Sequence, residues 1–156
     1  MTESRKHQEQ FERIKRWYER IKDIYEGIPH ERESDYYQDD VYAFFINCYH
    51  LKDWIKNDES VETFAKEKVQ GFIDKNRELK LCRDICHSLK HLKRNTEGRS
   101  GVGSPLGPRI FRFNVSTGII RAQYSITTET GETFDAYELA SRCVHLWEKF
   151  IEDNIE

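Results

Sequence analysis

Side chains that could carry out chemistry are concentrated in one segment of the chain, residues 83–94. At about 100° per residue, a helix over this segment gathers acidic, basic and histidine side chains on one side, within an arc of roughly 120°. We call this side the basic stripe; its members are Arg83, Asp84, His87, Lys90, His91 and Arg94. The opposite side is apolar and consists of Leu81, Cys82, Ile85, Leu89 and Leu92. We therefore expect the basic stripe to face away from the core.

The basic stripe contains the groups that RNA cleavage by its own 2′-hydroxyl requires. Histidine exchanges a proton near neutral pH, so His87 or His91 is the candidate acid or base. The planar guanidinium of Arg83 suits a phosphate or the extra charge on a pentavalent phosphorus. Asp84 is expected to orient a histidine. The candidates for holding the nucleic-acid backbone are Lys90, Lys93, Arg94 and Arg99.

Other interpretations of the same segment remain open. A zinc site is suggested by Cys82 and Cys86, one helical turn apart, with His87 adjacent. The thiols, however, point to the apolar side and the imidazole points away, whereas tetrahedral zinc needs convergent ligands. The same geometry disfavours a nucleophilic Cys–His pair. A solvated polar helix face also fits the residue types, and we expect neither a metal nor a cofactor.

Charge is unevenly distributed along the chain. The formal net charge is −3, so the chain as a whole does not resemble a nucleic-acid-binding protein. Residues 75–112 nevertheless hold ten Lys and Arg against three acids, between acidic flanks at 31–62 and 129–156. Such a local excess indicates an anion-binding surface, unless the acidic flanks neutralise it in the folded protein.

Hydrophobic periodicity predicts a mainly α (α+β) fold in a single domain over residues 1–156. An antiparallel bundle of about four helices is expected over 4–95. The first two helices are expected at 4–27 and 40–57. The third is expected to begin at an N-cap on Ser60, and the fourth to run from an N-cap on Asn76 to residue 94. A Gly/Ser/Pro-rich loop follows at 95–108. Alternating apolar residues then predict a three-stranded antiparallel β-meander over 109–134, and a closing helix at 135–155.

The second predicted helix is apolar around most of its circumference, so we expect it to be central. His50 and Asp53 lie one turn apart on its narrow polar edge. They are expected to form a hydrogen-bonded pair, and a role as accessory site residues stays open. The four cysteines lie in apolar stretches and are predicted to be reduced and buried. The absence of a leader-like segment or a long apolar run predicts a cytoplasmic protein that does not span a membrane.

Residues 35–95 resemble the HEPN superfamily, whose members are small helical bundles found in bacterial toxins and defence proteins. The family motif is an arginine followed by a polar residue and then by a histidine on the last bundle helix. Arg83 and Asp84 match its first two positions. His87 and His91 follow Arg83 after three and seven intervening residues, so the motif matches in residue type and differs in spacing. Segments 49–54 and 88–91 are also similar to a group of uncharacterised bacterial proteins.

The resemblance implies a homodimer that brings two copies of the basic stripe together and acts on RNA. The expected function is therefore that of a HEPN-like, RNA-directed protein, with metal-independent endoribonuclease activity in a bacterial toxin or defence system. Two alternatives remain: a non-catalytic module that binds protein or nucleic acid, and a structural or regulatory homo-oligomer. Residues 108–155 lie outside the resemblance.

Overall fold

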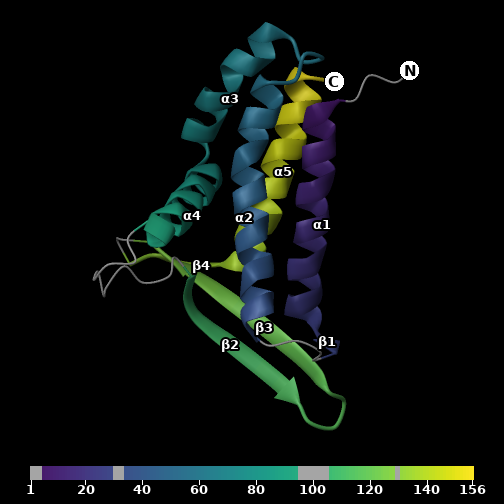
Figure 1. Cartoon of the computed structure of the whole chain (residues 1–156), viewed down its shortest axis with the longest axis vertical. Helices are drawn as coiled ribbons and strands as arrows, with labels where there is room; N and C mark the ends of the chain where they lie inside the picture. Colours follow the sequence, from purple (N-terminus) through teal and green to yellow (C-terminus); the bar gives the residue numbers. More distant parts are fainter. Residues whose placement is uncertain (1–4, 30–33, 95–105, 129–130) are drawn as a thin grey trace.

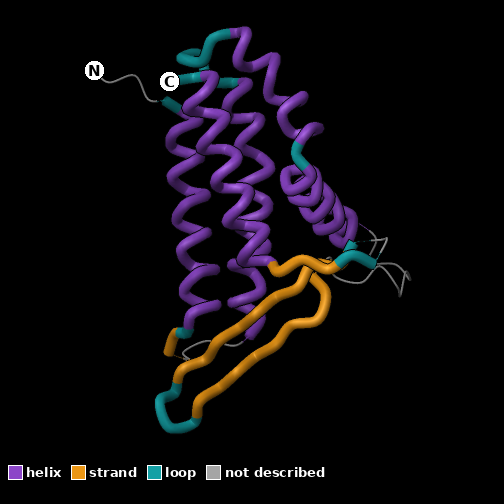
Figure 2. The backbone as a smooth tube through the Cα atoms, turned by 180° about the vertical axis from the view of Figure 1, so that it is seen from behind, coloured by secondary structure: helices purple, strands orange, loops and turns teal. Residues whose placement is uncertain are grey.

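The computed structural model describes residues 5–29, 34–94, 106–128 and 131–156, excluding the side chains of 34, 89–94, 106–109, 111 and 113. Five helices are described: α1 (Lys6–Glu26), α2 (Ser34–Lys56), α3 (Thr63–Lys75), α4 (Arg77–Arg94) and α5 (Ala136–Asn154). Figure 1 shows α1, α2 and α5 running side by side, with α3 and α4 along one flank and the strands at one end. Seen from behind, the hairpin lies across the foot of the bundle (Figure 2). The predicted mainly helical fold is confirmed.

Helix α2 is the centre of the bundle, as its apolar circumference predicts, since it contacts all four other helices. Its fully buried side chains are Tyr37, Val41, Phe44, Phe45, Cys48, Leu51 and Ile55. Helix α5 also packs inside the bundle, against α1, α2 and α4. The bundle thus includes the closing helix.

The strands form one antiparallel sheet in which β3 (Ile119–Thr127) is central. Strand β2 (Leu106–Asn114) pairs with one edge of β3, while β1 (Ile28–Pro29) and β4 (Thr133–Asp135) pair with the other edge at opposite ends. Alternate β3 residues are buried against the helices: Ile120, Ala122, Tyr124 and Ile126. The predicted meander is therefore confirmed, and β1 is an addition to it.

Several predicted boundaries are wrong. Helix α2 begins at Ser34, six residues before the predicted start at 40, because Tyr37 is buried on the same face as Val41 and extends the apolar stripe. Ser60 does not cap α3, which begins at Thr63; its N–H and hydroxyl instead donate to Asp58 at 2.9 and 2.7 Å. Helix α4 begins at Arg77, directly after Asn76, as predicted, while the Asn76 side chain donates to the Phe72 carbonyl at the end of α3. The Asp135 cap of α5 is as predicted.

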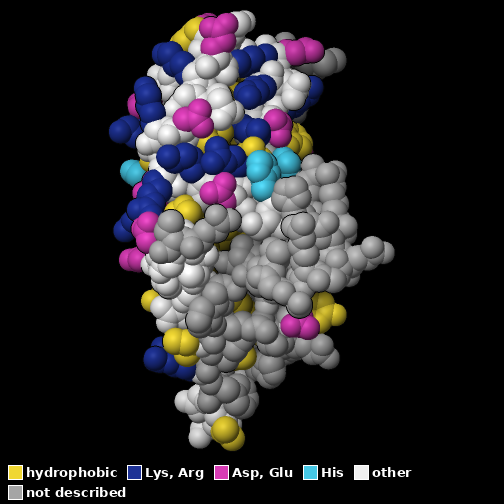
Figure 3. All heavy atoms as spheres, turned by 90° about the vertical axis from the view of Figure 1, so that its left-hand side faces the viewer, with side chains coloured by type: hydrophobic (Ala, Val, Ile, Leu, Met, Phe, Trp, Pro, Cys, Tyr) yellow, Lys and Arg dark blue, Asp and Glu magenta, His cyan; other side chains and the backbone are white. Residues whose placement is uncertain are grey.

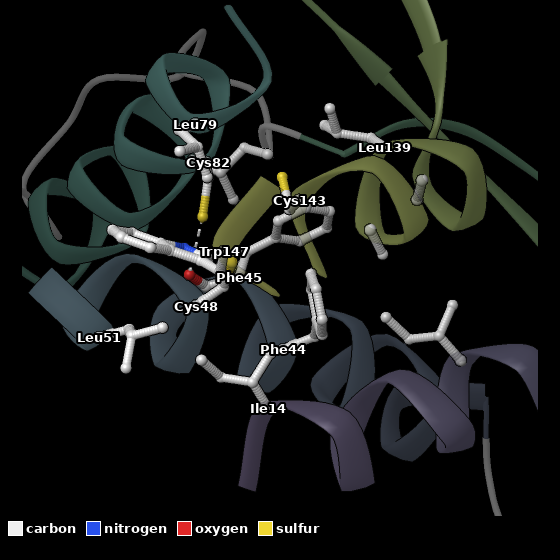
Figure 4. Close-up of a cluster of buried hydrophobic side chains, with 14 of the residues drawn as sticks. Ile14, Phe44, Phe45, Cys48, Leu51, Leu79, Cys82, Leu139, Cys143 and Trp147 are labelled. Carbon is white, nitrogen blue, oxygen red and sulfur yellow. Dashed lines mark hydrogen bonds between the residues drawn. The ribbon is translucent and has the colours of Figure 1, made fainter. Parts of the chain in front are cut away.

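Three of the four buried, free cysteines meet in the core, where α2, α4 and α5 converge (Figure 4). The Cys82 thiol donates to the Phe45 carbonyl at 3.2 Å, and the Cys143 thiol to the Glu78 carbonyl at 3.5 Å. Burial raises the pKa of the Cys82 thiol, which keeps it protonated and unreactive. The prediction of reduced, buried thiols is confirmed. No helix in the described part of the chain has the length and apolar content to cross a bilayer.

Gly27 links α1 to the sheet and is expected to tolerate no side chain. Its φ is +123°, and an added Cβ would lie 3.0 Å from Ile119 Cγ2 and 3.2 Å from Arg121 Nε. We expect Gly27→Ala to lower the free energy of unfolding by about 1–3 kcal/mol, measured by urea denaturation.

Gly71 provides the matched control for this substitution. It lies within α3 with no atom within 4 Å of an added Cβ. Gly71→Ala is therefore expected to stabilise the protein by up to about 1 kcal/mol, because alanine is the better helix former. Equal effects at the two glycines would contradict this account of the α1–β1 junction.

Candidate functional site

The described part of α4 has the two faces that its periodicity predicts. Leu79, Cys82, Ile85 and Cys86 are buried against the bundle. On the basic stripe, Asp84 and His87 are exposed and Arg83 is partly exposed. The outward orientation of the stripe is therefore confirmed for these three residues.

The ring of Tyr49 on α2 brings together groups from two helices. The His87 imidazole of α4 meets this ring edge-on, with centroids 5.5 Å apart, and the His50 imidazole lies at 5.8 Å. The Lys52 ammonium sits 4.4 Å from the ring centroid. We call this group, together with Asp53 and Cys86, the Tyr49 site. It places two imidazoles and an ammonium along the seam between α2 and α4.

His50 is held from both of its ring nitrogens. Nδ1 lies 3.3 Å from Asp53 Oδ2, and Nε2 lies 4.0 Å from Cys86 Sγ. The predicted His50–Asp53 pair is thus confirmed, and both side chains are 48% exposed. Asp53 orients the imidazole through Nδ1, whereas the contact of Nε2 with Cys86 is long enough for this nitrogen to exchange it for a substrate group.

The Cys86 thiol lies beside a histidine of another helix, His50 of α2. The contacts run from the Asp53 carboxylate to the His50 imidazole and on to the Cys86 thiol. Cys86 is only 9% exposed, however, and a nucleophile must reach its substrate. The thiol therefore serves His50 as a packing and hydrogen-bonding partner.

Arg83 lies one turn before His87 and is engaged by two acids. Its Nε is 3.3 Å from Asp84 Oδ1, and its NH1 is 3.9 Å from Asp74 Oδ1. Asp84 thus contacts Arg83, and the acid that contacts His50 beside it on this face is Asp53. The pairs are exposed, with Asp74 54% and Asp84 62% accessible, so an incoming phosphate can compete for the guanidinium.

Figure 3 shows the face of the molecule that carries α3 and α4, where Lys and Arg side chains gather with histidine beside them and acids between them. The acidic flanks neutralise part of this charge, since Arg77 pairs with Glu132. The remaining predicted site residues are outside the described part of the molecule. These are the side chains of Lys90, His91, Lys93 and Arg94, and residue Arg99.

A second histidine–carboxylate pair is buried where α1 begins. His7 Nδ1 lies 2.6 Å from Asp58 Oδ2, and both side chains are at most 3% exposed. Burial alone would raise the pKa of the Asp58 carboxyl. Hydrogen bonds from His7 and Ser60 outweigh burial and hold that pKa well below its usual range. The pair ties α1 to the α2–α3 connection and is a structural contact.

Sequence reasoning did not single out Tyr49 or Lys52 as site residues, weighed Cys86 only as a zinc ligand or a nucleophile, and did not predict that His50 and His87 meet at one ring. In the sequence, the only signal for these residues is the aromatic and basic residue types beside His50. The side chains converge only when α2 and α4 are aligned, which neither helix shows by itself. Within the described residues, no cluster of three or more His, Cys, Asp or Glu side chains is arranged to hold a metal ion. The groups present support proton transfer and anion binding.

Comparisons with protein-family models, with curated proteins and with solved structures find no match to this chain.

Proposed function

We propose that the protein is a HEPN-like, RNA-directed endoribonuclease that needs no metal ion and acts at the Tyr49 site. The observation that carries the proposal is the approach of His50 and His87 to the same tyrosine ring from different helices. An RNA strand lying over the Tyr49 ring would pass both exposed imidazoles. By the resemblance of residues 35–95, such an activity would belong to a bacterial toxin or defence system.

The reaction is an internal transesterification. One neutral imidazole accepts the proton of the 2′-hydroxyl, whose oxygen attacks the adjacent phosphorus. The P–O5′ bond breaks, and the second imidazole, which is protonated, donates its proton to O5′. The products carry a 2′,3′-cyclic phosphate and a 5′-hydroxyl. Asp53 orients His50, and the positive charges of Lys52 and Arg83 stabilise the negative charge that develops on the phosphoryl oxygens.

Both histidines come from one chain, so the proposed chemistry does not depend on a second copy. A homodimer, which the resemblance implies, would present two such sites. Two non-catalytic alternatives remain: a module that binds protein or nucleic acid through the same surface, and a structural or regulatory homo-oligomer. Either alternative would be supported by a protein that does not cleave RNA but still binds a partner or oligomerises.

The test uses an RNA oligonucleotide of mixed sequence, incubated with the full chain in excess EDTA. We expect cleavage, with a bell-shaped pH dependence near neutrality because the two imidazoles act in opposite protonation states. Matched oligonucleotides with a single 2′-deoxy residue should lose cleavage only at the bond after that residue. Cleavage that continues at the 2′-deoxy position would eliminate the proposed attack by the 2′-hydroxyl.

Arg83 is expected to contribute through its bidentate fork. Arg83→Gln should lower the cleavage rate by roughly 10²–10³-fold, as losing one oxyanion donor does, and Arg83→Lys should restore only part of it. The rates are compared at saturating RNA. Arg142→Gln, a change at an exposed arginine on α5, is the control and should leave the rate unchanged. An Arg83→Gln rate equal to that of the wild type would remove Arg83 from the site.

A further inference from the structure

Two arginines face each other across the β2–β3 hairpin. Arg112 and Arg121 are partners in the strand register, and both are exposed. The neighbouring β3 residues Ile120 and Ala122 point to the buried side, so the arginines occupy the outer face of the sheet. Ile110 and Ile119 are also exposed, at 50% and 38%. We call this outer surface the arginine face.

The juxtaposition is unfavourable without an anion. Like charges directly opposite each other in an antiparallel pair destabilise the sheet. Within the described residues, neither arginine takes part in an ion pair, whereas Arg77 and Arg83 both do. The other outer-facing pairs along the β2–β3 ladder are uncharged. Ile110 pairs with Gln123, and Asn114 pairs with Ile119. The one carboxylate in the described sheet is that of Asp135 on β4, which accepts hydrogen bonds from Gln123 and from the Glu138 N–H and forms no ion pair with either arginine.

Hollows lie on both sides of the arginine pair along the hairpin. One, of about 150 Å³, is lined by Tyr25, Ile110, Arg112, Arg121, Ala122 and Gln123. The other, of about 630 Å³, is open and extends toward the turn past Asn114, Val115 and Thr117. Both hollows are lined by Arg112 and Arg121, so the arginines stand at the middle of an extended track.

Tyr25 gives the smaller hollow an aromatic wall. It is 40% exposed, and its ring stacks on Tyr137 at 4.7 Å with an interplanar angle of 13°. Tyr137 in turn stacks on Tyr18 at 5.8 Å. The buttressed ring is held in a fixed orientation, which lowers the entropic cost of stacking a further flat group against it.

We propose that the arginine face binds single-stranded RNA. Phosphates lie along the Arg112–Arg121 pair and a base stacks beside Tyr25, the combination of cation and aromatic ring that single-strand binding uses. The choice of RNA rests on the proposed function, and the arginine face would hold the strand whose scissile bond reaches the Tyr49 site. The surface itself is separate from the Tyr49 site, since none of its residues is shared.

The experiment measures binding of the full chain to a fluorescent 2′-O-methyl RNA oligonucleotide, which the proposed chemistry cannot cleave. Arg112→Gln/Arg121→Gln should weaken binding at least tenfold. It should also reduce the slope of log K against log salt by about 1.4, as expected for two lost phosphate contacts on a single strand. Tyr25→Leu should weaken binding several-fold, and Tyr25→Phe should not.

The matched control is Arg5→Gln/Arg16→Gln, which removes the same charge from exposed positions before and within α1. It should change binding by less than twofold. The melting temperature of Arg112→Gln/Arg121→Gln should equal or exceed that of the wild type, because a like-charge pair is removed. Unchanged RNA binding by this double variant would overturn the proposal. The proposal would also be overturned if polyglutamate displaced the bound oligonucleotide as well as RNA does, because that result would point to an acidic protein partner.

Failure here is distinguishable from failure of the Tyr49 site. A dinucleoside monophosphate is too short to use the arginine face, so Arg112→Gln/Arg121→Gln should cleave it at the wild-type rate while losing oligonucleotide binding. His50→Ala/His87→Ala should keep oligonucleotide binding and lose cleavage of the dinucleoside monophosphate. An arginine variant that loses dinucleotide cleavage would contradict a separate binding role.

Discussion

Replacing His50 or His87 with alanine is expected to reduce RNA cleavage by roughly 10²–10⁴-fold, the usual contribution of a general acid or base. The two side chains act in the same transition state, so the double variant should be little worse than the more damaging single one. Both imidazoles are exposed at the α2–α4 seam, and their removal should leave the fold intact. The measurement is the initial cleavage rate in EDTA, with the circular dichroism melt recorded for each variant.

His145→Ala is the control for these substitutions. His145 is an exposed histidine on α5 that takes no part in the Tyr49 site, and its loss should not change the rate. Cys86→Ala should change the rate only a few-fold, because the thiol packs against His50 and does not react. A Cys86→Ala variant as inactive as His50→Ala would replace the acid–base account with a thiol mechanism.

Breaking the His7–Asp58 pair is expected to have the largest effect on stability. Asp58 accepts four hydrogen bonds, from the backbone and side chains of His7 and Ser60, in a site where its side chain is 2% exposed. Asp58→Ala would leave those donors without their acceptor. We expect the free energy of unfolding at pH 7 to fall by about 3–5 kcal/mol, measured by urea denaturation.

The effect should depend on pH in one direction. Because the folded-state pKa of Asp58 lies below its unfolded value, its stabilisation is fully present above about pH 5 and is lost as pH falls below about 4. The wild type and Asp58→Ala should therefore converge in stability at acidic pH. Asp153→Asn, at an exposed position on α5, should stay within about 0.5 kcal/mol of the wild type. A stability gap that widens on acidification would contradict the assigned ionisation.

Sequence patterns predicted the features of this fold that depend on one element at a time. The 3.6-residue period of α4 placed Arg83 and His87 outside and Cys82 inside, as the structure has them. The apolar circumference of α2 identified it as the central helix, and alternation in β3 identified its buried face. These features follow from local periodicity, which needs no knowledge of partners.

The features that escaped prediction depend on the alignment of separate elements. His50 meets Cys86, and Tyr49 meets His87, because α2 and α4 cross at one register, which neither helix encodes alone. The His7–Asp58 contact joins residues 51 positions apart. Asp58 also explains the misplaced cap, since its buried carboxylate recruits the Ser60 hydroxyl that was expected to begin α3. Strand β1 is only two residues long and has no periodic signal to detect.

The most direct test of the Tyr49 site is the chemical identity of the new RNA ends formed in excess EDTA. Mass spectrometry of the fragments should show a 2′,3′-cyclic phosphate on one side of each cut and a 5′-hydroxyl on the other. These ends should disappear with the His50→Ala/His87→Ala variant and persist with His145→Ala. Intact RNA after incubation with the wild type, or 3′-hydroxyl ends that appear only when Mg²⁺ is supplied, would contradict acid–base cleavage at this seam.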